Sequence, residues 1–220
     1  MTMIKDLEQL FIQHADKDIA LQQAAYMKNI SPYLGLNKPV RAALQKPLFK
    51  KYKFTSAELT EIVRILWRKN EREYCYAALD LLLHNKKLWT ADFLLLFEEL
   101  IAHKPWWDTV DILATNCFGP LIQRNPDLVH VMDTWIKDSA MWKRRVALIY
   151  QLKYKDTTDT HRLTKYITII MHEREFFIAK AIGWSLREYS KTNPTWVREF
   201  INLHKNELAP LSIREGGKYC

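Results

Sequence analysis

The chain has 220 residues, and 48% of them are hydrophobic, which is enough to bury the core of one large domain or of a short repeat array. Lys and Arg number 33 against 25 Asp and Glu, so the formal net charge of +8 favours a polyanionic partner such as nucleic acid. The three cysteines are too far apart for a disulfide framework or a CxxC motif, and no apolar run approaches the length of about 18 residues that a membrane span needs.

The start of the chain, MTMIKDLEQL, is charged and amphipathic, unlike a signal peptide, and unpaired cysteines suit a reducing cytoplasm. After it, apolar residues follow helical spacing almost throughout. Leu59, Ile62, Val63, Leu66 and Trp67 lie on one helical face, and the preceding Thr55 and Glu58 form a capping box. Further helical stripes run through 74–81, 93–101 and 178–189, and Asn193-Pro194 predicts the start of a helix that ends near residue 204.

Breaks between these stripes are short. They fall at Ser31-Pro32, Asn70, Asn85 to Thr90, Lys104-Pro105, Asn125-Pro126, Asp138-Ser139, Asp156 to Asp159 and Thr192 to Pro194. With only 5 glycines and no Asn-Gly or Asp-Gly hairpin signal, we predict an all-α fold in a single domain, residues 1–220. Helices of about 10 to 15 residues with short links favour an α-solenoid of degenerate repeats, and a single irregular bundle is the alternative.

The concave surface of a solenoid could follow a DNA backbone if basic side chains lie along it. The basic clusters are Lys50 to Lys53, Lys143 to Arg145, and Lys153 to Lys155, together with Arg187. From these we select five candidate phosphate contacts, which would hold DNA without reading its sequence: Lys51, Arg144, Lys153, Lys155 and Arg187. The alternative for each cluster is an ordinary solvated helix face.

Tryptophans stand beside ionisable groups in three helical segments: Trp106 to Asp111, Met141 to Arg145, and Ile182 to Tyr189. Residues four apart share a helical face, so Trp107 lies beside Asp111, and Trp184 neighbours Arg187 three residues later. An indole beside a carboxylate, with guanidinium groups from other helices, suits a flat, cationic, phosphate-linked ligand. The remaining tryptophans are expected to have packing roles: core or partly buried packing for Trp67, Trp89, Trp135 and Trp196, and packing between helices for Trp106 and Trp142.

A family resemblance runs from about residue 20 to 215, in the order and spacing of short segments. These are Tyr26 to Asn29, Glu71 to Tyr74, Ala77 to Asp80, Trp106 to Asp111, Trp142 to Arg145, Gln151 to Lys155, Phe176 to Ile178, Lys180 to Trp184, Leu186 to Tyr189, Lys191 to Pro194 and Leu208 to Ser212. The sequence resembles the DNA alkylation repair family of AlkD-like DNA glycosylases. Those proteins consist of HEAT-like helical repeats, so the resemblance implies a HEAT-like α-solenoid with a basic concave face.

The resemblance also implies an activity. The family hydrolyses the N-glycosidic bond of purines alkylated at N3 or N7, and its catalytic tryptophans, aspartate and arginine correspond here to Trp107, Trp184, Asp111 and Arg145. Its further arginine corresponds to Arg187, and Arg144 is an alternative to Arg145. We accordingly expect a monomer that acts on double-stranded DNA containing alkylated bases. It would need no metal or other cofactor and no membrane, and would work at the nucleoid of a bacterial cytoplasm.

The expected chemistry follows from the lesion. An alkylated purine is already cationic, so it leaves readily, and positive charge develops on the sugar. Asp111 could stabilise that charge or orient water, the indoles could face the cationic nucleotide, and Arg145 could bind a phosphate. No residue is marked as an amine nucleophile, so we expect an abasic site without strand cleavage.

Simpler roles remain open for these residues. Asp111 could form a structural ion pair with an arginine, and Asp108 could cap the helix start. Gly183 within a helix indicates either close helix packing or room for a ligand beside Trp184. At the level of the whole protein, a module that binds damaged DNA without catalysis and a protein-binding scaffold are the alternatives. The HExxH, GxSxG and GxxxxGK motifs are absent.

Overall fold

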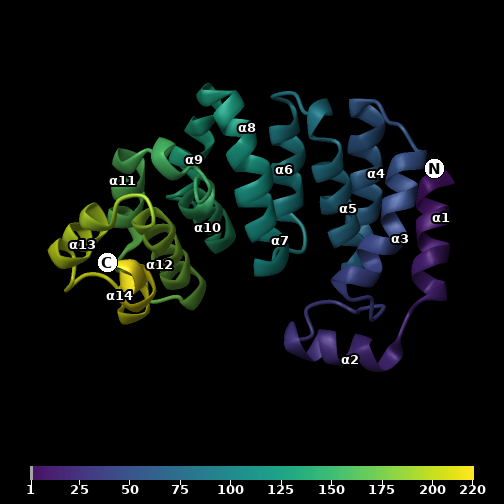
Figure 1. Ribbon diagram of the computed structural model, residues 1–220, viewed down its shortest axis with the longest axis horizontal. Coiled ribbons are helices and arrows are strands. Elements are labelled where there is room, and N and C mark those ends of the chain that lie inside the picture. The colour runs from purple at the N-terminus through teal and green to yellow at the C-terminus, as the bar shows by residue number, and fades with distance from the viewer. Residues whose placement is uncertain (1) are drawn as a thin grey trace. The chain divides into compact units, whose positions relative to one another are not determined.

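The computed structural model describes residues 2–220, and all regular secondary structure among them is helical (Figure 1). The chain forms two compact units, the first ending at Asp92 and the second running from Phe93 to Cys220. Within each unit, helices contact mainly their near neighbours in the sequence, as in an all-α repeat solenoid. This confirms the predicted fold class. The single domain, the HEAT relationship and the basic concave face stay predictions.

The described part of the first unit, residues 2–92, contains five α-helices and one 3₁₀ turn: α1 (Thr2–Gln13), α2 (Lys17–Tyr26), α3 (Lys38–Lys51), α4 (Ser56–Arg68), α5 (Arg72–His84) and η1 (Lys86–Leu88). The predicted capping box is confirmed, because Glu58 accepts a hydrogen bond from the Thr55 backbone N–H while the Thr55 hydroxyl accepts one from the Glu58 N–H. The apolar stripe of α4 is buried as predicted. Helices α3 and α4 both contribute to the packing around α5.

A buried carboxylate fixes the loop before α3. Glu73, fully buried in α5, accepts hydrogen bonds from the backbone N–H groups of Leu34, Gly35 and Leu36. Gly35 has φ +87°, a left-handed conformation that favours glycine, and a Cβ there would meet the Asp16 carbonyl oxygen at 2.0 Å. The loop is therefore held by one side chain from a helix 37 to 39 residues later.

The second unit holds the tryptophan segments. Its elements are α6 (Phe93–Ala102), α7 (Trp107–Ile112), η2 (Leu113–Phe118), α8 (Gly119–Arg124), η3 (Pro126–Val129), α9 (His130–Trp135), α10 (Met141–Ile149), η4 (Lys155–Thr157), α11 (Thr160–Ile170), α12 (Phe176–Ser190), α13 (Pro194–Leu203), α14 (Pro210–Gly216) and η5 (Gly217–Tyr219). Asn193 caps α13 through the Trp196 N–H, as predicted. Three of the predicted breaks contain or adjoin 3₁₀ turns, which apolar periodicity does not reveal.

Helix α10 contacts both α7, which precedes it in the chain, and α12, which follows it. The contact between α12 and α14 is the most extensive one between any two elements of the described residues, and Figure 1 shows these helices side by side. These contacts bring residues 107–111, 145, 184 and 215 into one region of the second unit. No helix among residues 2–220 combines the length and the apolar character needed to cross a membrane.

Candidate functional site

Asp111 lies near the end of α7, where the helix changes its winding. Helix α7 passes into the π-helical segment η2 and then into α8 without leaving helical backbone angles. The Thr115 hydroxyl donates a 2.8 Å hydrogen bond to the Asp111 carbonyl oxygen at this transition. Single π turns inside α-helices occur frequently at functional sites. The π segment that begins two residues after Asp111 therefore marks this part of the chain as a candidate site, independently of the carboxylate.

The Asp111 carboxylate receives both arms of one guanidinium group. Arg145 Nε donates to Oδ1 at 2.8 Å, and Arg145 Nη2 donates to Oδ2 at 2.9 Å. Such a bidentate pair fixes the plane of the carboxylate as well as its position. The Arg145 side chain is 2% exposed and that of Asp111 is 18% exposed, so the carboxylate is the part of the pair that solvent reaches.

Arg145 also contacts α12. Its Nη1 donates to the Phe177 carbonyl oxygen, and its guanidinium carbon lies 5.2 Å from the centroid of the Trp184 ring. One buried side chain of α10 thus joins α7 to α12. The guanidinium is directed to protein groups in this structure, in contrast to the DNA phosphate that we expected it to bind.

Arg144 has different surroundings. It donates to the carbonyl oxygens of Asp138 and Ser139 and forms an ion pair with Glu173 at 3.0 Å. Of the two arginines, Arg145 is therefore the one that the structure brings to Asp111. Asp138 and Ser139 lie in the predicted break before α10, so Arg144 stabilises the start of that helix.

The two candidate tryptophans lie on different helices, Trp107 on α7 and Trp184 on α12. Trp184 of α12 is half-buried, with the Arg145 guanidinium 5.2 Å and the Lys180 ammonium 6.0 Å from its ring centroid. Trp107, also half-buried, begins α7 and shares a helical face with Asp111. The structure therefore brings Asp111, Arg145 and Trp184 together by direct contacts, and Trp107 by helix geometry.

An aromatic cluster adjoins this region, because the Arg145 guanidinium lies 5.8 Å from the centroid of the Phe177 ring. Trp106 contacts Trp142 and Phe177 with ring centroids 5.6 and 5.4 Å apart, and Trp142 lies 5.0 Å from Phe177. Such ring contacts add rigidity beyond simple burial. The expectation that Trp106 and Trp142 pack between helices is confirmed. The prediction of core or partly buried packing is also confirmed: Trp67, Trp89 and Trp135 are buried, and Trp196 is half-buried and stacks on Phe200.

Asp108 and Gly183 have structural contacts. Asp108 Oδ1 accepts a hydrogen bond from the N–H of Thr109 at 2.9 Å, at the start of α7. A Cβ at Gly183 would lie 2.6 Å from the Glu215 Cβ and 3.3 Å from the Ser212 carbonyl oxygen. Of the two reasons considered for Gly183, close helix packing is therefore the one that the structure shows.

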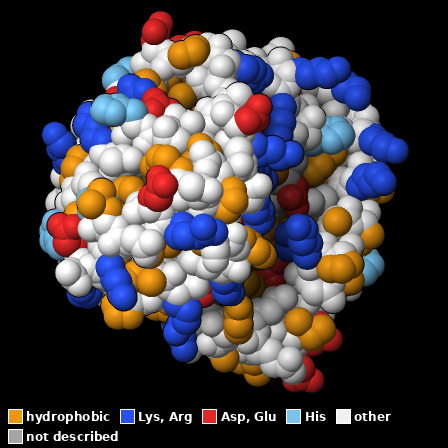
Figure 2. Space-filling model, turned by 60° about the vertical axis from the view of Figure 1, so that its left-hand side comes forward, with side chains coloured by type: hydrophobic (Ala, Val, Ile, Leu, Met, Phe, Trp, Pro, Cys, Tyr) orange, Lys and Arg blue, Asp and Glu red, His pale blue; other side chains and the backbone are white. Residues whose placement is uncertain are grey.

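The candidate phosphate contacts are mostly engaged with other protein groups. Arg187 pairs with Glu215 at 2.8 Å, Lys51 pairs with Asp6 at 3.1 Å, and Lys153 donates to the Asn116 side chain. Figure 2 shows Lys and Arg side chains at many points of the face that it draws, with acidic side chains among them. A DNA-binding role for these residues stays a prediction.

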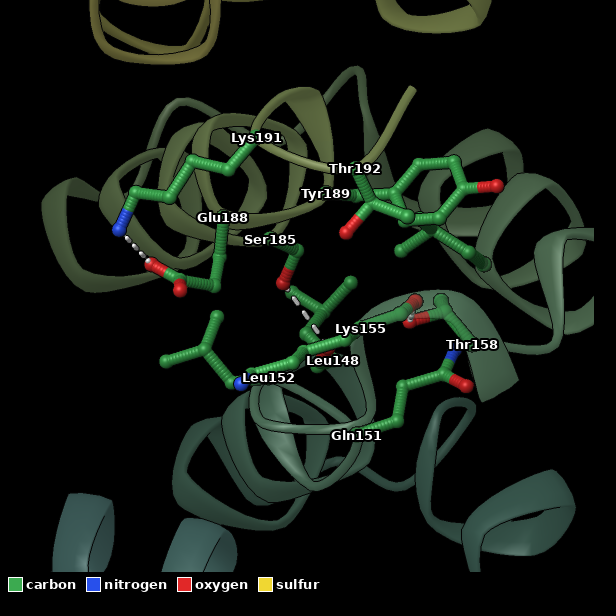
Figure 3. Close-up of a pocket in the computed structure, with 11 residues that line it drawn as sticks. Leu148, Gln151, Leu152, Lys155, Thr158, Ser185, Glu188, Tyr189, Lys191 and Thr192 are labelled. Carbon is green, nitrogen blue, oxygen red and sulfur yellow. Dashed lines mark hydrogen bonds and ion pairs between the residues drawn. The ribbon is translucent and has the colours of Figure 1, made fainter. Parts of the chain in front are cut away.

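Lys155 lines a separate pocket. This pocket has a volume of about 280 Å³ and is bounded by the ends of α10 and α12, η4 and α11, with lining residues that include Leu148, Gln151, Thr158 and Tyr189. In Figure 3, Ser185 points from α12 to the Leu148 carbonyl oxygen and Lys191 extends to Glu188. None of the four catalytic candidates lines the pocket. Within residues 2–220, no cluster of His, Cys, Asp and Glu is arranged to hold a metal ion.

The chain is similar to one described protein family and to solved structures. It matches the family model described as "DNA alkylation repair enzyme" over residues 7–220. A solved structure described as a predicted DNA alkylation repair enzyme from Enterococcus faecalis is 37% identical, with a TM-score of 0.86 and coverage of 93% of this chain and 96% of that one. The structure of smu.31 from Streptococcus mutans UA159 is 15% identical, with a TM-score of 0.62 and coverage of 91% and 98%, and supports the fold alone. No functionally curated protein matches. The chain belongs to the DNA alkylation repair enzyme family.

Proposed function

We propose that this protein is a monofunctional DNA glycosylase that hydrolyses the N-glycosidic bond of N3- or N7-alkylated purines in duplex DNA. The observation that carries the proposal is the Asp111 carboxylate, fixed by the buried Arg145 and partly open to solvent beside an indole. Family membership supports a role in DNA alkylation repair. The positive formal charge of +8 is compatible with a DNA substrate.

The bond cleavage needs little help at the base. Alkylation gives the purine a positive charge, so the electron pair of the breaking C1′–N bond neutralises the departing base. Positive charge then develops on the deoxyribose in an oxocarbenium-like state. A carboxylate held beside C1′ stabilises that charge, and preorganised groups of this kind commonly contribute about 10²- to 10³-fold in kcat.

Water completes the reaction. The water oxygen bonds to C1′ and loses a proton, which Asp111 can accept or pass to solvent. Each carboxylate oxygen has a second acceptor site beyond the hydrogen bond from Arg145, so the pair leaves Asp111 able to bind water. The products are a neutral alkylpurine and an abasic site.

Arg145 acts in this proposal as a positioning residue. It is too deeply buried to meet a phosphate directly, but its two hydrogen bonds hold the Asp111 carboxylate in one orientation. Catalysis depends on this because a group aligned before the reaction need not reorganise during it. The indoles of Trp107 and Trp184 would then face the cationic nucleotide, and each cation–π contact would contribute about 0.5 to 2 kcal/mol.

A non-catalytic module that binds damaged DNA is the second candidate. Its specific support is that Asp111 and Arg145 satisfy one another as a structural ion pair. In that case removal of the Asp111 charge would reduce stability and would leave no activity to lose. The two candidates therefore differ in whether the intact protein releases any base.

The test is incubation of the protein with duplex DNA containing 7-methylguanine, followed by chromatography of the freed bases. We expect release by the unaltered protein, loss of release in Asp111→Asn, and duplex binding that stays within about threefold, since Asp111 makes no phosphate contact. Asp108→Asn is the matched control, because it removes a carboxylate from the same helix without touching Arg145. If the unaltered protein frees no alkylated base, the glycosylase proposal is wrong.

A further inference from the structure

Trp184 stands in a row with two cationic side chains on α12. Lys180 lies four residues before it and Arg187 three residues after it, so all three share a helical face. The Lys180 ammonium lies 6.0 Å from the Trp184 ring centroid. Without an anion nearby, two cations at this spacing would repel one another and move apart into solvent.

The anion comes from α14. Glu215 Oε1 accepts a hydrogen bond from Lys180 Nζ at 3.0 Å, and Glu215 Oε2 accepts one from Arg187 Nη1 at 2.8 Å. The Glu215 side chain is only 8% exposed, and Lys218 adds a third cation at 3.7 Å. One buried carboxylate thus joins the two ends of the Lys180, Trp184 and Arg187 row.

Close packing aligns α14 with this row. The absence of a side chain at Gly183 allows Glu215 to pack closely against α12. A Cβ added at Gly183 would lie only 2.6 Å from the Glu215 Cβ, which is too close for two carbon atoms that are not bonded. The Ser212 hydroxyl donates to the Ala179 carbonyl oxygen at 2.8 Å and anchors the start of α14 on α12. The position of Glu215 is therefore set by backbone contacts as well as by charge.

We propose that Glu215 is a positioning residue for Trp184, which it keeps in place by holding the cationic side chains on either side of the indole. The inference rests on the proposed glycosylase function, in which Trp184 faces the cationic nucleotide. Arg145 of α10 lies over the indole directly, whereas Glu215 of α14 reaches it through Lys180. Because Glu215 has no direct contact with the site carboxylate, its effect reaches the reaction through Trp184.

Steady-state kinetics separate this role from a purely structural one. Glu215→Gln keeps the shape and removes the charge, so we expect kcat per folded molecule to fall about ten- to a hundredfold, as for a misplaced site group, with KM changed by less than about threefold. Glu188→Gln is the matched control, because Glu188 of α12 forms a 2.6 Å ion pair with Lys191, the residue that follows the helix. Unchanged kcat in Glu215→Gln, with the folded fraction measured by circular dichroism, would overturn the proposal.

A double-mutant cycle tests the route of the effect. If Glu215 acts through Lys180, the variant with both Glu215→Gln and Lys180→Gln should lose no more kcat than the worse single variant, because coupled residues are not additive. Fully additive losses would contradict this route. All variants are measured with the same substrate and assay, so any departure from additive losses of kcat reports the coupling between Glu215 and Lys180.

The position of the indole can also be observed without turnover. In protein labelled with 5-fluorotryptophan, the ¹⁹F signal missing from Trp184→Phe identifies Trp184. We expect Glu215→Gln to shift or broaden that signal and Glu188→Gln to leave it unchanged. An unaltered Trp184 signal in Glu215→Gln would overturn the positioning role. If the unaltered protein released no base while the signal shifted as expected, the glycosylase proposal would fail and the positioning of Trp184 would stand.

Discussion

Each compact unit contains a buried arginine that meets a partly exposed aspartate beside an aromatic ring. In the second unit Arg145 meets Asp111 near Trp184, and in the first Arg41 of α3 meets Asp80 of α5, with the Tyr76 ring 4.7 Å from the Arg41 guanidinium. The residue types are alike, so composition alone would not separate the two places.

The contacts separate them. Arg145 makes two hydrogen bonds to Asp111 at 2.8 and 2.9 Å, whereas the Arg41 to Asp80 distance is 3.7 Å and Gln45 supplies the hydrogen bond to Asp80. Arg41 Nε and Gln45 Oε1 are buried without a hydrogen-bond partner, and burial lowers the pKa of Arg41 in spite of the nearby Asp80. A carboxylate is therefore oriented firmly in the second unit and loosely in the first, which is why we place the chemistry at Asp111.

The largest expected effect comes from removing the charge of the aspartate in each unit, which tests the difference between the two arginine–aspartate pairs directly. Asp111→Asn should lower single-turnover release of 7-methylguanine by about 10²-fold or more, since it removes the charge that stabilises the sugar cation. Asp80→Asn makes the same change in the first unit and should stay within about threefold of the unaltered protein, because that carboxylate has no proposed contact with the sugar. Equal losses in the two variants would show that the two pairs have the same role.

Substitution of the arginines comes next. Arg145→Lys keeps the charge and cannot supply both arms of the fork, so at least one charge-assisted hydrogen bond is lost, worth about 1.5 to 3 kcal/mol. We expect both kcat and the melting temperature to fall. Arg41→Lys should cost less stability, because Arg41 makes only one long contact with Asp80. Thermal unfolding followed by circular dichroism, with kinetics on the same samples, checks both, and a larger loss in Arg41→Lys would reverse the ranking of the pairs.

In the second unit, α14 packs closely on the helix that carries Trp184. The described contacts of Arg41 and Asp80 in the first unit include no such helix, and a glycine substitution tests the packing of α14. A methyl group at Gly183 would collide with Glu215, so Gly183→Ala should cost about 1 to 3 kcal/mol, as overpacking usually does. Gly217→Ala is the control, because a Cβ there meets no atom within 4 Å. Denaturant unfolding measures both, and equal stability of the two variants would argue against close packing of α14 on α12.

The smallest expected effect is a pH dependence. The hydrogen bond from Lys180, with the charges of Lys180, Lys218 and Arg187, lowers the pKa of Glu215 below its usual value of 4.5. A carboxyl group with a lowered native pKa contributes stability above its unfolded pKa and loses it as the pH falls through the native value. The melting temperature of the unaltered protein should thus exceed that of Glu215→Gln near pH 7, and the difference should shrink below pH 4.5. A constant difference down to pH 3 would contradict this assignment.

Local patterns in the sequence were sufficient to place five of the α-helices, α4, α5, α6, α12 and α13. Apolar spacing placed α4, α5, α6 and α12, and the Thr55 capping box and the Asn193 cap were confirmed at the predicted residues. Each of these features depends on residues three or four positions apart, whose relation is set by helix geometry itself. The π segment η2 was missed because it changes the winding without interrupting the apolar pattern, and the 3₁₀ turns η1, η3 and η4 were missed because they lie at breaks between the apolar stripes, where the pattern gives no signal.

The partners of the site residues needed the fold. Trp107 and Asp111 share a face that their spacing predicts, but Arg145 lies 34 residues from Asp111 and 32 from Phe177, and no local rule chooses between those partners and a phosphate. Glu215 was not selected at all, because a lone glutamate near the end of the chain carries no pattern. Gly183 was the one available signal, and it indicated close packing without naming the side chain that approaches it.

The central claim is that an oriented carboxylate at Asp111 promotes cleavage of the glycosidic bond. The most direct measurement is single-turnover release of 7-methylguanine from duplex DNA by the unaltered protein and by Asp111→Asn, with duplex affinity determined on the same preparations. The account predicts release by the unaltered protein and a loss of about 10²-fold or more in the variant at nearly equal affinity. Equal release by both proteins, or none by either, would contradict it.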